Sequence, residues 1–563
     1  MAFAGTVVVG IIVLSIAWRY LGHYMTLVYE GQITYARRVE RVIYRLLGVD
    51  PDQEQRWNRY AISLVVFSGV CVAFTYVLLR LQGHLALNPN HEPGVPPSLA
   101  LNTAVSFVTN TNWQNYAGET TMSYLSQMAV LGLQMFVSAS VGVAVAIALI
   151  RGISRRHAST IGNFWVDLVR GVLYIFLPIS VIAAVVFMAQ GAVQTFGADI
   201  SVTDPLNGFA QVIARGPVAS MEAIKQLGTN GGGYFNANGA HPFENPTGLT
   251  NFLSIILILS VPVALTRVFG EMVGRIREGA FVLGVMASIF VLSAAIGVHA
   301  ELGANAAVHA GGLTHQVGGN MVGKEVRFGA ANSALYDITS TQTSTGSVNS
   351  AIDSYTPVGS MMALVGMMLG EVSPGGVGSG IYTYLLFAIV AVFLAGLMVG
   401  RTPEYLGKKI QAREMKVAAF GVLVMPLTVL IFTGVATAIH QGTGQVLNHG
   451  PHGFSEILYA FVSQGNNNGS AFAGLNGNTP FYNIAGAIAM ALGRFAIIIP
   501  VLCLGGLFAA QGQVPITVGT LRSDTVLFAS LVLGVIIVVG GLTFLPALSL
   551  GSLAEALSHG RLF

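Results

Sequence analysis

Long apolar runs recur along the whole chain and determine its predicted architecture. Ten runs reach the roughly 20 mainly apolar residues that a membrane-spanning helix needs. They lie near residues 4–24, 61–82, 124–150, 171–190, 249–268, 279–299, 381–400, 417–439, 484–509 and 525–547. No basic stretch precedes the first run and no clear cleavage site follows it, so we expect a retained helix. The pattern predicts an all-α polytopic membrane protein with about ten transmembrane helices.

Four short polar stretches, rich in Asn, Thr, Ser and Gly, separate some of these runs. They read TNTNWQ at 109–114, LGTNGGG at 227–233, TSTGSVN at 343–349 and QGNNNGS at 464–470. Gly and Asn adopt backbone conformations that other residues avoid, which exposes carbonyl groups. Four such turns suggest four parts of one ring, and a ring of carbonyls can replace the water shell of a monovalent cation. Four external loops rich in turn residues are the alternative.

A short apolar segment precedes each polar stretch and is too short to cross a membrane. These segments lie at 97–107, at 208–214 with 216–224, at 329–335 and at 453–462. Non-helical backbone at membrane depth is tolerated only where protein or a water-filled cavity satisfies it. We therefore expect re-entrant pore helices and a repeated unit of helix, pore helix, filter loop and helix. The predicted repeats are 61–150, 171–268, 279–400 and 417–509, with further helices in 1–60 and 525–563.

Composition agrees with a membrane protein. Apolar residues make up 53% of the chain and charged residues only 9%, whereas soluble domains carry about a quarter charged residues. The net charge of +3 comes without a basic patch interleaved with aromatics, so nothing indicates nucleic-acid binding. Cys71 and Cys503 lie within apolar runs and are expected to be small buried hydrophobes.

Lys and Arg residues predict the orientation. With an external N-terminus, the connections at 25–60, 151–170, 268–278, 401–416 and 510–524 are cytoplasmic and hold most of the 27 Lys and Arg residues. The opposite side holds Arg215, Lys225, Lys324, Arg327 and Arg561. Basic residues favour the cytoplasmic side. Both termini and all four polar stretches are then expected to be external.

Two ionisable residues stand in apolar surroundings. Glu371 comes just before the helix-breaking stretch 373–380, which contains Gly375 and Gly376, and Arg494 lies inside the ninth run. Buried membrane charges usually face a pathway or a partner. We expect a gate below the filter, with Arg494 turning a descending cation sideways; a structural ion pair is the alternative.

Other chemistries find little support. The closest phosphate-binding loop, GGNMVGKE at 318–325, ends in Glu instead of Ser or Thr, and no Asp-Lys-Thr-Gly or His-Glu-x-x-His motif occurs. His241 and Glu244 have no further His or Cys nearby, so a metal site is disfavoured there. We expect Glu244 to cap or brace the start of the fifth long helix.

Five segments carry a resemblance to a known family. They are TNTNWQ at 109–114, GTNGGGYFNAN at 228–238, AHPFENPT at 240–247, GRTPEYLGKK at 400–409 and NNNGSAFAG at 466–474. With them, the chain resembles the potassium-binding A subunits of the bacterial Kdp potassium-transporting ATPase, from the first apolar run to the last.

The resemblance implies a four-repeat potassium-channel fold in one polypeptide. It also implies a non-enzymatic subunit of a high-affinity uptake complex in the bacterial inner membrane, surrounded by membrane lipids. A P-type ATPase B subunit would hydrolyse ATP and receive K⁺ through an intramembrane tunnel, and small C and F subunits would complete the complex. No tightly bound cofactor is implied beyond the transported K⁺. A passive channel or an ion-coupled transporter of the Trk or Ktr kind is the alternative.

The resemblance also implies the residues whose backbone faces the ion. These are Asn110, Thr111, Asn112, Thr229, Asn230, Gly231, Ser344, Thr345, Gly346, Asn467, Asn468 and Gly469. Gln114 would shape the filter entrance. The third set resembles the family least, since many relatives have Cys where Thr345 stands.

Overall fold

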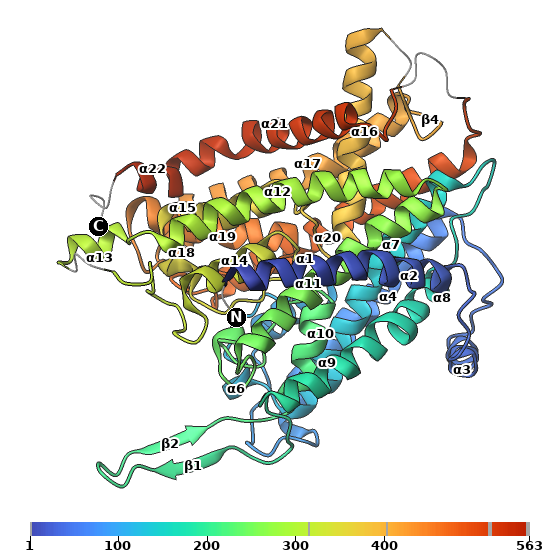
Figure 1. Cartoon of the computed structure of the whole chain (residues 1–563). Helices are drawn as coiled ribbons and strands as arrows, with labels where there is room; N and C mark the ends of the chain where they lie inside the picture. Colours follow the sequence, from blue (N-terminus) through green and yellow to red (C-terminus); the bar gives the residue numbers. More distant parts are fainter. Residues whose placement is uncertain (1–2, 313–315, 401–402, 516–520, 559–563) are drawn as a thin grey trace.

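The computed structural model describes residues 3–312, 316–400, 403–515 and 521–558. Long helices, many of them side by side, dominate the fold (Figure 1). In the described chain, ten helical segments are long and apolar enough to span a membrane, as predicted. They are Phe3–Tyr29 (α1 to α2), Trp57–His84 (α4, η2), Ser126–Ser154 (η3, α7), Phe164–Ala189 (α8 to α9), Gly248–Met272 (α11), Ile276–Leu302 (α12), Ser379–Met398 (within α16, Ser379–Val399), Ala412–Ala438 (α17), Pro480–Ala510 (α20) and Val526–Leu550 (α21).

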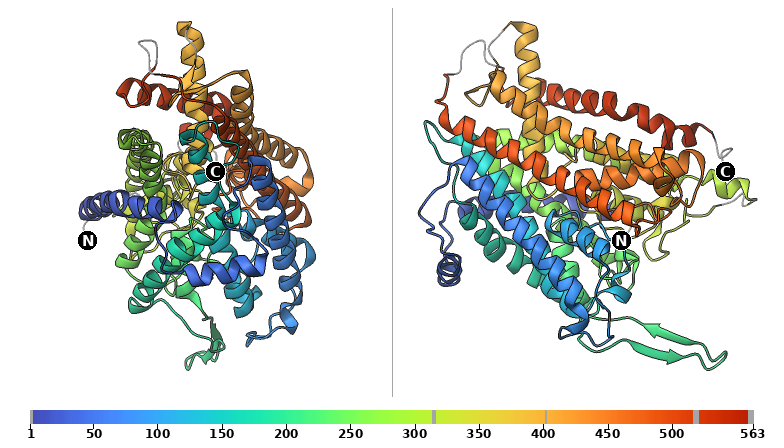
Figure 2. Two further views of the ribbon diagram at one scale, coloured as in Figure 1. Left: turned by 90° about the vertical axis from the view of Figure 1, so that its right-hand side faces the viewer. Right: turned by 180° about the vertical axis from the view of Figure 1, so that it is seen from behind.

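These spans differ in how much protein surrounds them. In the most apolar window, 83% of residues are buried in α11 and in the span containing α7 (Leu133–Ser154), but 6% in the first span and 22% in α21. Lipid is as apolar as leucine, so close packing of small residues, and not hydrophobicity, brings spans together. A Cβ atom at Gly152 of α7 would overlap the backbone of Gly505 in α20. The two further views in Figure 2 show the long helices gathered into one bundle.

A short helix leads into each polar stretch. These are α5 (Pro97–Val108), α10 (Val218–Leu227), α14 (Gly329–Thr341) and α19 (Gly450–Asn466). The helix predicted at 208–214 is wrong, because β2 (Ala210–Ile213) pairs there with β1 (Ile200–Thr203). The left-handed Gly208, at φ 74°, lies in the connection, and most residues of the hairpin are exposed. Among the described residues, none covers this segment to bury an apolar helical face, and the hairpin projects away from the helices (Figure 1).

The helix break predicted in the third repeat is present. Helix α15 (Pro357–Met368) ends, a loop runs through 369–378, and α16 begins at Ser379. Gly370, Gly375 and Gly378 have φ values of 83°, 78° and 99°, which end regular helix in this loop.

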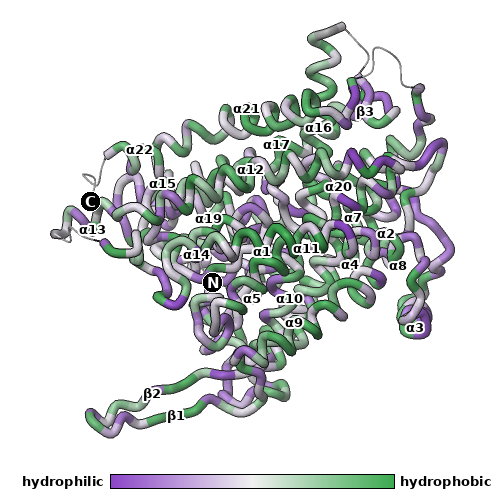
Figure 3. Tube along the Cα trace, viewed as in Figure 1, coloured by the Kyte–Doolittle hydropathy of each residue, from purple (hydrophilic) through white to green (hydrophobic). Residues whose placement is uncertain are grey.

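Many of the basic connections meet at one end of the molecule. Helix α3 (Arg37–Leu47) and strands β3 (Glu404–Tyr405) and β4 (Lys408–Lys409) lie there, away from α13 (Ala306–Ala310) and α22 (Ser552–Leu557) (Figure 1). Lys408 Nζ donates to the carbonyl oxygens of Arg155, Phe508 and Gln511. Figure 3 shows hydrophilic segments at this end and hydrophobic helices beyond it. Arg401 and Arg561 lie outside the described residues.

Candidate functional site

The four polar stretches share one backbone conformation. We number four turn positions in each: 109–112, 228–231, 343–346 and 466–469. Position two and position four have positive φ in every turn: Asn110 and Asn112 (66° and 55°), Thr229 and Gly231 (46° and 82°), Ser344 and Gly346 (49° and 81°), Asn467 and Gly469 (60° and 105°). Non-glycine residues rarely adopt this region, so its recurrence at matched positions marks one repeated local structure.

A repeated hydrogen bond fixes the same conformation. The position-three amide donates to the carbonyl five residues earlier, in the preceding short helix. The pairs are Thr111 to Ser106 (3.0 Å), Asn230 to Lys225 (2.9 Å), Thr345 to Ser340 (3.2 Å) and Asn468 to Ser463 (2.8 Å). Each polar turn is therefore fastened to the end of its own short helix.

The turns pack against one another in chain order. A Cβ atom at Gly231 would overlap the carbonyl oxygen of Thr345 in the third turn. A Cβ atom at Gly346 would overlap that of Asn468, and one at Gly469 would overlap that of Thr111. Only glycine allows these approaches, since its neighbour's carbonyl occupies the place of a side chain.

Side chains close the ring between the first and second turns. Asn110 Nδ2 donates to the carbonyl of Thr229 at 2.8 Å, and Asn230 Nδ2 donates to Asn110 Oδ1 at 2.8 Å. Gln114 accepts from the amide of Gly233 at 2.9 Å and donates to its carbonyl at 3.0 Å. The four turns thus form a closed ring.

Cavities lie on both sides of this ring. On one side is a cavity of about 580 Å³, lined by the position-four residues of all four turns and by Gln114. On the other side is a smaller cavity of about 40 Å³, lined by position two of three turns, Asn110, Ser344 and Asn467. The ring therefore separates a wide mouth from a much smaller space that still has room for water.

The position-three carbonyls are available to a ligand. Within the described chain, no N–H or O–H group donates to the carbonyl oxygens of Thr111, Asn230, Thr345 or Asn468. By contrast, the carbonyl of Gly231 accepts from Asn238 Nδ2 at 2.6 Å, and that of Thr229 is taken by Asn110. A neutral set of four free carbonyl dipoles suits a weakly hydrated monovalent cation.

The loop at 369–378 lies against the narrow side of the ring. Glu371, 2% exposed, accepts from Asn468 Nδ2 at 2.8 Å and from the hydroxyl of Ser344. The amide of Gly375 donates to the carbonyl of Gln342 at 3.0 Å, and Gly376 lines the small cavity. The carboxyl group of Glu371 thus links the third and fourth turns on the side of the small cavity.

Arg494 shares the small cavity with Glu371 without pairing to it. Its Nη2 donates to the carbonyl of Ser138 at 2.8 Å, and its buried Nε has no partner in the described chain. Among the ion pairs of the described residues, none joins these two side chains. The alternative of a structural ion pair between Glu371 and Arg494 is therefore not found.

A buried charge cluster supports the second turn, and its only sign in the sequence analysis is a lysine close to an apolar segment. Lys225 Nζ lies 2.5 Å from Glu222 and 3.7 Å from Glu244, and donates to Asn238 at 2.8 Å. Glu244 also accepts from the amide of Tyr234 at 2.5 Å. Burial raises the pKa of Glu244 above its usual range, although Lys225 opposes the shift.

Two expectations near this cluster need correction or detail. Glu244 does not cap the fifth span; Thr247 does, accepting from the amide of Thr250 at 3.2 Å. His241 stacks on Phe235 with ring centroids 3.6 Å apart, and its Nδ1 accepts from the amide of Phe243 at 3.1 Å. Burial, with a contribution from Arg327, lowers the pKa of His241 to about 4.

Sequence comparisons match almost the whole chain. The family model described as potassium-transporting ATPase A subunit matches residues 7–557. A protein of Granulibacter bethesdensis, named potassium-transporting ATPase potassium-binding subunit, is 52% identical over 100% of this chain and 99% of its own length. Proteins of the same name from Mesorhizobium japonicum and Methylobacterium nodulans are 51% and 52% identical, covering 96% and 98% of this chain and 96% of each relative.

A solved structure has the same fold. The crystal structure of the potassium transporter TrkH from Vibrio parahaemolyticus matches with a TM-score of 0.54 at 12% identity, covering 89% of this chain and 98% of that one.

Proposed function

The chain belongs to the family of potassium-transporting ATPase A subunits, and on this premise we propose that it selects K⁺ in the ring of four turns. In this proposal the mouth cavity faces the outside of the cell, and K⁺ sheds water as it enters the ring. The position-three carbonyls of Thr111, Asn230, Thr345 and Asn468 replace that water. Positions two and four hold these carbonyls in place.

One observation carries the proposal. Four carbonyl oxygens to which no group of the described chain donates lie at matched positions of a closed ring, between a wide and a narrow cavity. Free buried carbonyls are costly unless something satisfies them. A monovalent cation does so without the carboxylates that a divalent ion usually recruits.

The narrow cavity supports a sideways exit. Beyond the ring it is lined by Tyr382, Thr383 and Phe387 of α16 and by Gly421, Val422 and Met425 of α17. Arg494 adds a fixed positive charge, which disfavours a straight path for a cation through the protein. We propose that the ion leaves between these helices toward an ATPase B subunit, which hydrolyses ATP, in a complex with small C and F subunits in the inner membrane.

A passive or ion-coupled transporter is the second candidate, because the fold is shared with TrkH. Arg494 in the narrow cavity distinguishes the two, since a free-running channel has little use for a fixed cation at its exit.

Uptake of radioactive rubidium into proteoliposomes tests the proposal. We expect uptake only when the chain is reconstituted with its ATPase partner and ATP, and none with a non-hydrolysable ATP analogue. Uptake by the chain alone, at the same rate with and without ATP, would instead establish the channel or ion-coupled candidate.

A further inference from the structure

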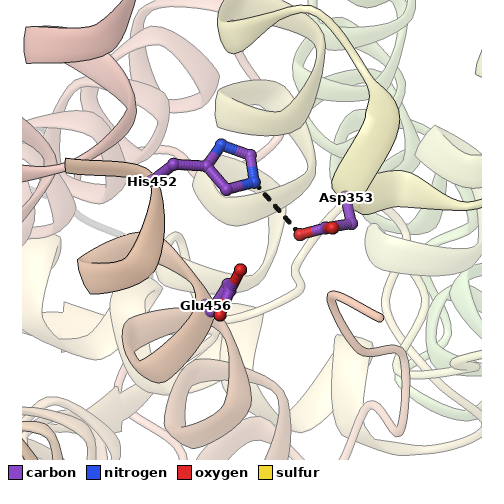
Figure 4. A group of neighbouring side chains, drawn as sticks. All are labelled: Asp353, His452 and Glu456. Atoms are coloured by element: carbon purple, nitrogen blue, oxygen red, sulfur yellow. Dashed lines mark hydrogen bonds and ion pairs between the residues drawn. The ribbon is translucent and has the colours of Figure 1, made fainter. Parts of the chain in front are cut away.

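A second cluster of ligand-type side chains lies away from the ring. Asp353, His452 and Glu456 each offer one ligand atom, and the three atoms lie within 4.8 Å of one another. Figure 4 shows the imidazole of His452 facing the carboxylate of Asp353, with the Glu456 carboxylate below the two. None of these residues takes part in the ring described above.

One distance between two of these ligand atoms agrees with a single small metal ion. His452 Nε2 lies 3.1 Å from Asp353 Oδ1. Two ligands at the usual Zn–N and Zn–O distances on one tetrahedral Zn²⁺ lie roughly 3.3 Å apart. His452 and Glu456 are four residues apart on α19, so they share one helix face.

The other nitrogen of His452 has the partner that metal-binding histidines usually have. His452 Nδ1 lies 3.1 Å and 3.2 Å from the two carboxylate oxygens of Glu555 in α22. A carboxylate on the far nitrogen orients an imidazole and makes it a better metal ligand. Glu555 thus fixes the orientation of the His452 imidazole, with Nε2 directed at Asp353 and Glu456.

The cluster holds more negative than positive charge. Asp353, Glu456 and Glu555 supply three carboxylates, and among the described residues no lysine or arginine pairs with any of them. The side chains are enclosed, with 14% of Asp353, 8% of His452 and 5% of Glu555 exposed. Glu456 also accepts from the side chain of Asn448 at 2.7 Å, from the amide of Asn448 at 3.3 Å and from the amide of Leu447 at 3.1 Å. A carboxylate has about four lone-pair sites, so one is left for a metal after three such bonds.

We propose that Asp353, His452 and Glu456 bind one divalent transition-metal ion of the Zn²⁺ type, with Glu555 as the positioning residue. Imidazole favours such an ion over Mg²⁺ or Ca²⁺, which prefer all-oxygen sites. Asp353 lies in η6 (Ile352–Ser354), after the third turn, and α19 leads into the fourth. The metal joins these two segments, and the contact between His452 and Glu555 ties them to α22, so the site braces two quarters of the ring from the mouth side.

Metal analysis of the purified complex tests this site. The complex is stripped with EDTA, reloaded with Zn²⁺, desalted and measured by mass spectrometry for zinc per chain. We expect one zinc that is lost in His452→Gln and Asp353→Asn, and an affinity about 10–100-fold weaker in Glu555→Gln. The control His440→Gln, which alters an exposed histidine on α18 (His440–Thr443), keeps the zinc.

Equal zinc in the wild type and in His452→Gln would overturn the site. A zinc absorption-edge spectrum of the unmodified complex keeps the test independent of folding in the variants. We expect a mixed nitrogen and oxygen shell at about 2.0–2.2 Å; a spectrum of six waters, or one with sulfur ligands, would also overturn it.

Discussion

At the scale of the residue, glycine at position four decides how closely two turns approach. Gly231, Gly346 and Gly469 each face the carbonyl of the next turn where a side chain would begin. The first turn has Asn112 instead, whose buried amide makes no hydrogen bond in the described chain. The sequence predicted all four turns and their residues, but not that position three alone leaves its carbonyls free in every turn. That distinction depends on Asn110 and Asn238, which reach across from other segments.

Gly231→Asp is expected to weaken K⁺ binding. A side chain in the left-handed region costs roughly 1–3 kcal/mol, and here it also displaces the Thr345 carbonyl and adds a charge to the ring. We expect the K⁺ concentration for half-maximal ATP hydrolysis by the complex to rise about tenfold or more. Gly208→Asp is the control, because Gly208 also has positive φ but nothing lies within 4 Å of its missing Cβ. An unchanged K⁺ requirement in Gly231→Asp would contradict the role of the ring.

Arg494→Gln is expected to loosen coupling between transport and hydrolysis. The substitution removes the fixed charge from the narrow cavity. An amide then replaces the guanidinium group as the donor to the carbonyl of Ser138. We expect more rubidium transported per ATP hydrolysed, or transport without ATP, in proteoliposomes. Arg494→Lys keeps the charge and should stay near the wild-type ratio. A glutamine variant with the wild-type ratio would remove the role assigned to Arg494.

His241 gives the protein a pH-dependent stability. Its pKa is lowered from about 6.5 to about 4, so the folded state keeps a neutral imidazole while the unfolded chain takes up a proton. The stabilisation is therefore complete above about pH 6.5 and is lost as the pH falls toward 4. We expect the unfolding midpoint to drop between pH 7 and pH 5, and to drop less in His241→Gln than in the exposed control His440→Gln. Equal drops in the two variants would show that another group is responsible.

At the scale of the element, the same four-residue turn ends four short helices of quite different sequence. The apolar segments 97–107, 216–224, 329–335 and 453–462 predicted these helices, because each is too short to span and leads into a polar turn. The same reasoning failed at 208–214, where β-branched residues and Gly208 form an exposed hairpin. Length and composition alone do not distinguish a short buried helix from a strand. The outcome depends on whether neighbouring segments can cover the apolar face of a helix.

The loop between α15 and α16 acts on the ring through one carboxylate. Glu371→Gln replaces an acceptor of two hydrogen bonds by an amide that has a single acceptor oxygen. A buried donor that loses its acceptor costs about 1–3 kcal/mol. We expect the K⁺ requirement of the complex to rise about tenfold.

Glu325→Gln is the matched control for this substitution, since Glu325 pairs at the surface with Arg327. An equal K⁺ requirement in both variants would mean that the loop is only a structural connection.

At the scale of the whole molecule, the ring exists only because distant parts of one chain meet. The ten spans could be predicted, because each apolar run is long enough to cross a membrane by itself. Which spans lie inside could not, because α11 and α21 are similarly apolar yet differ widely in burial. The approach of Gly469 to Thr111, more than half the chain away, and the convergence of Asp353, His452 and Glu456 are likewise set by packing between distant segments.

The most direct test is to locate the ion in the complex. Crystals grown in Rb⁺ give an anomalous difference map in which the bound cation is seen directly. The account predicts a peak on the axis of the ring, between the carbonyl oxygens of Thr111, Asn230, Thr345 and Asn468. An empty ring, with Rb⁺ held instead by carboxylates elsewhere in the chain, would contradict it.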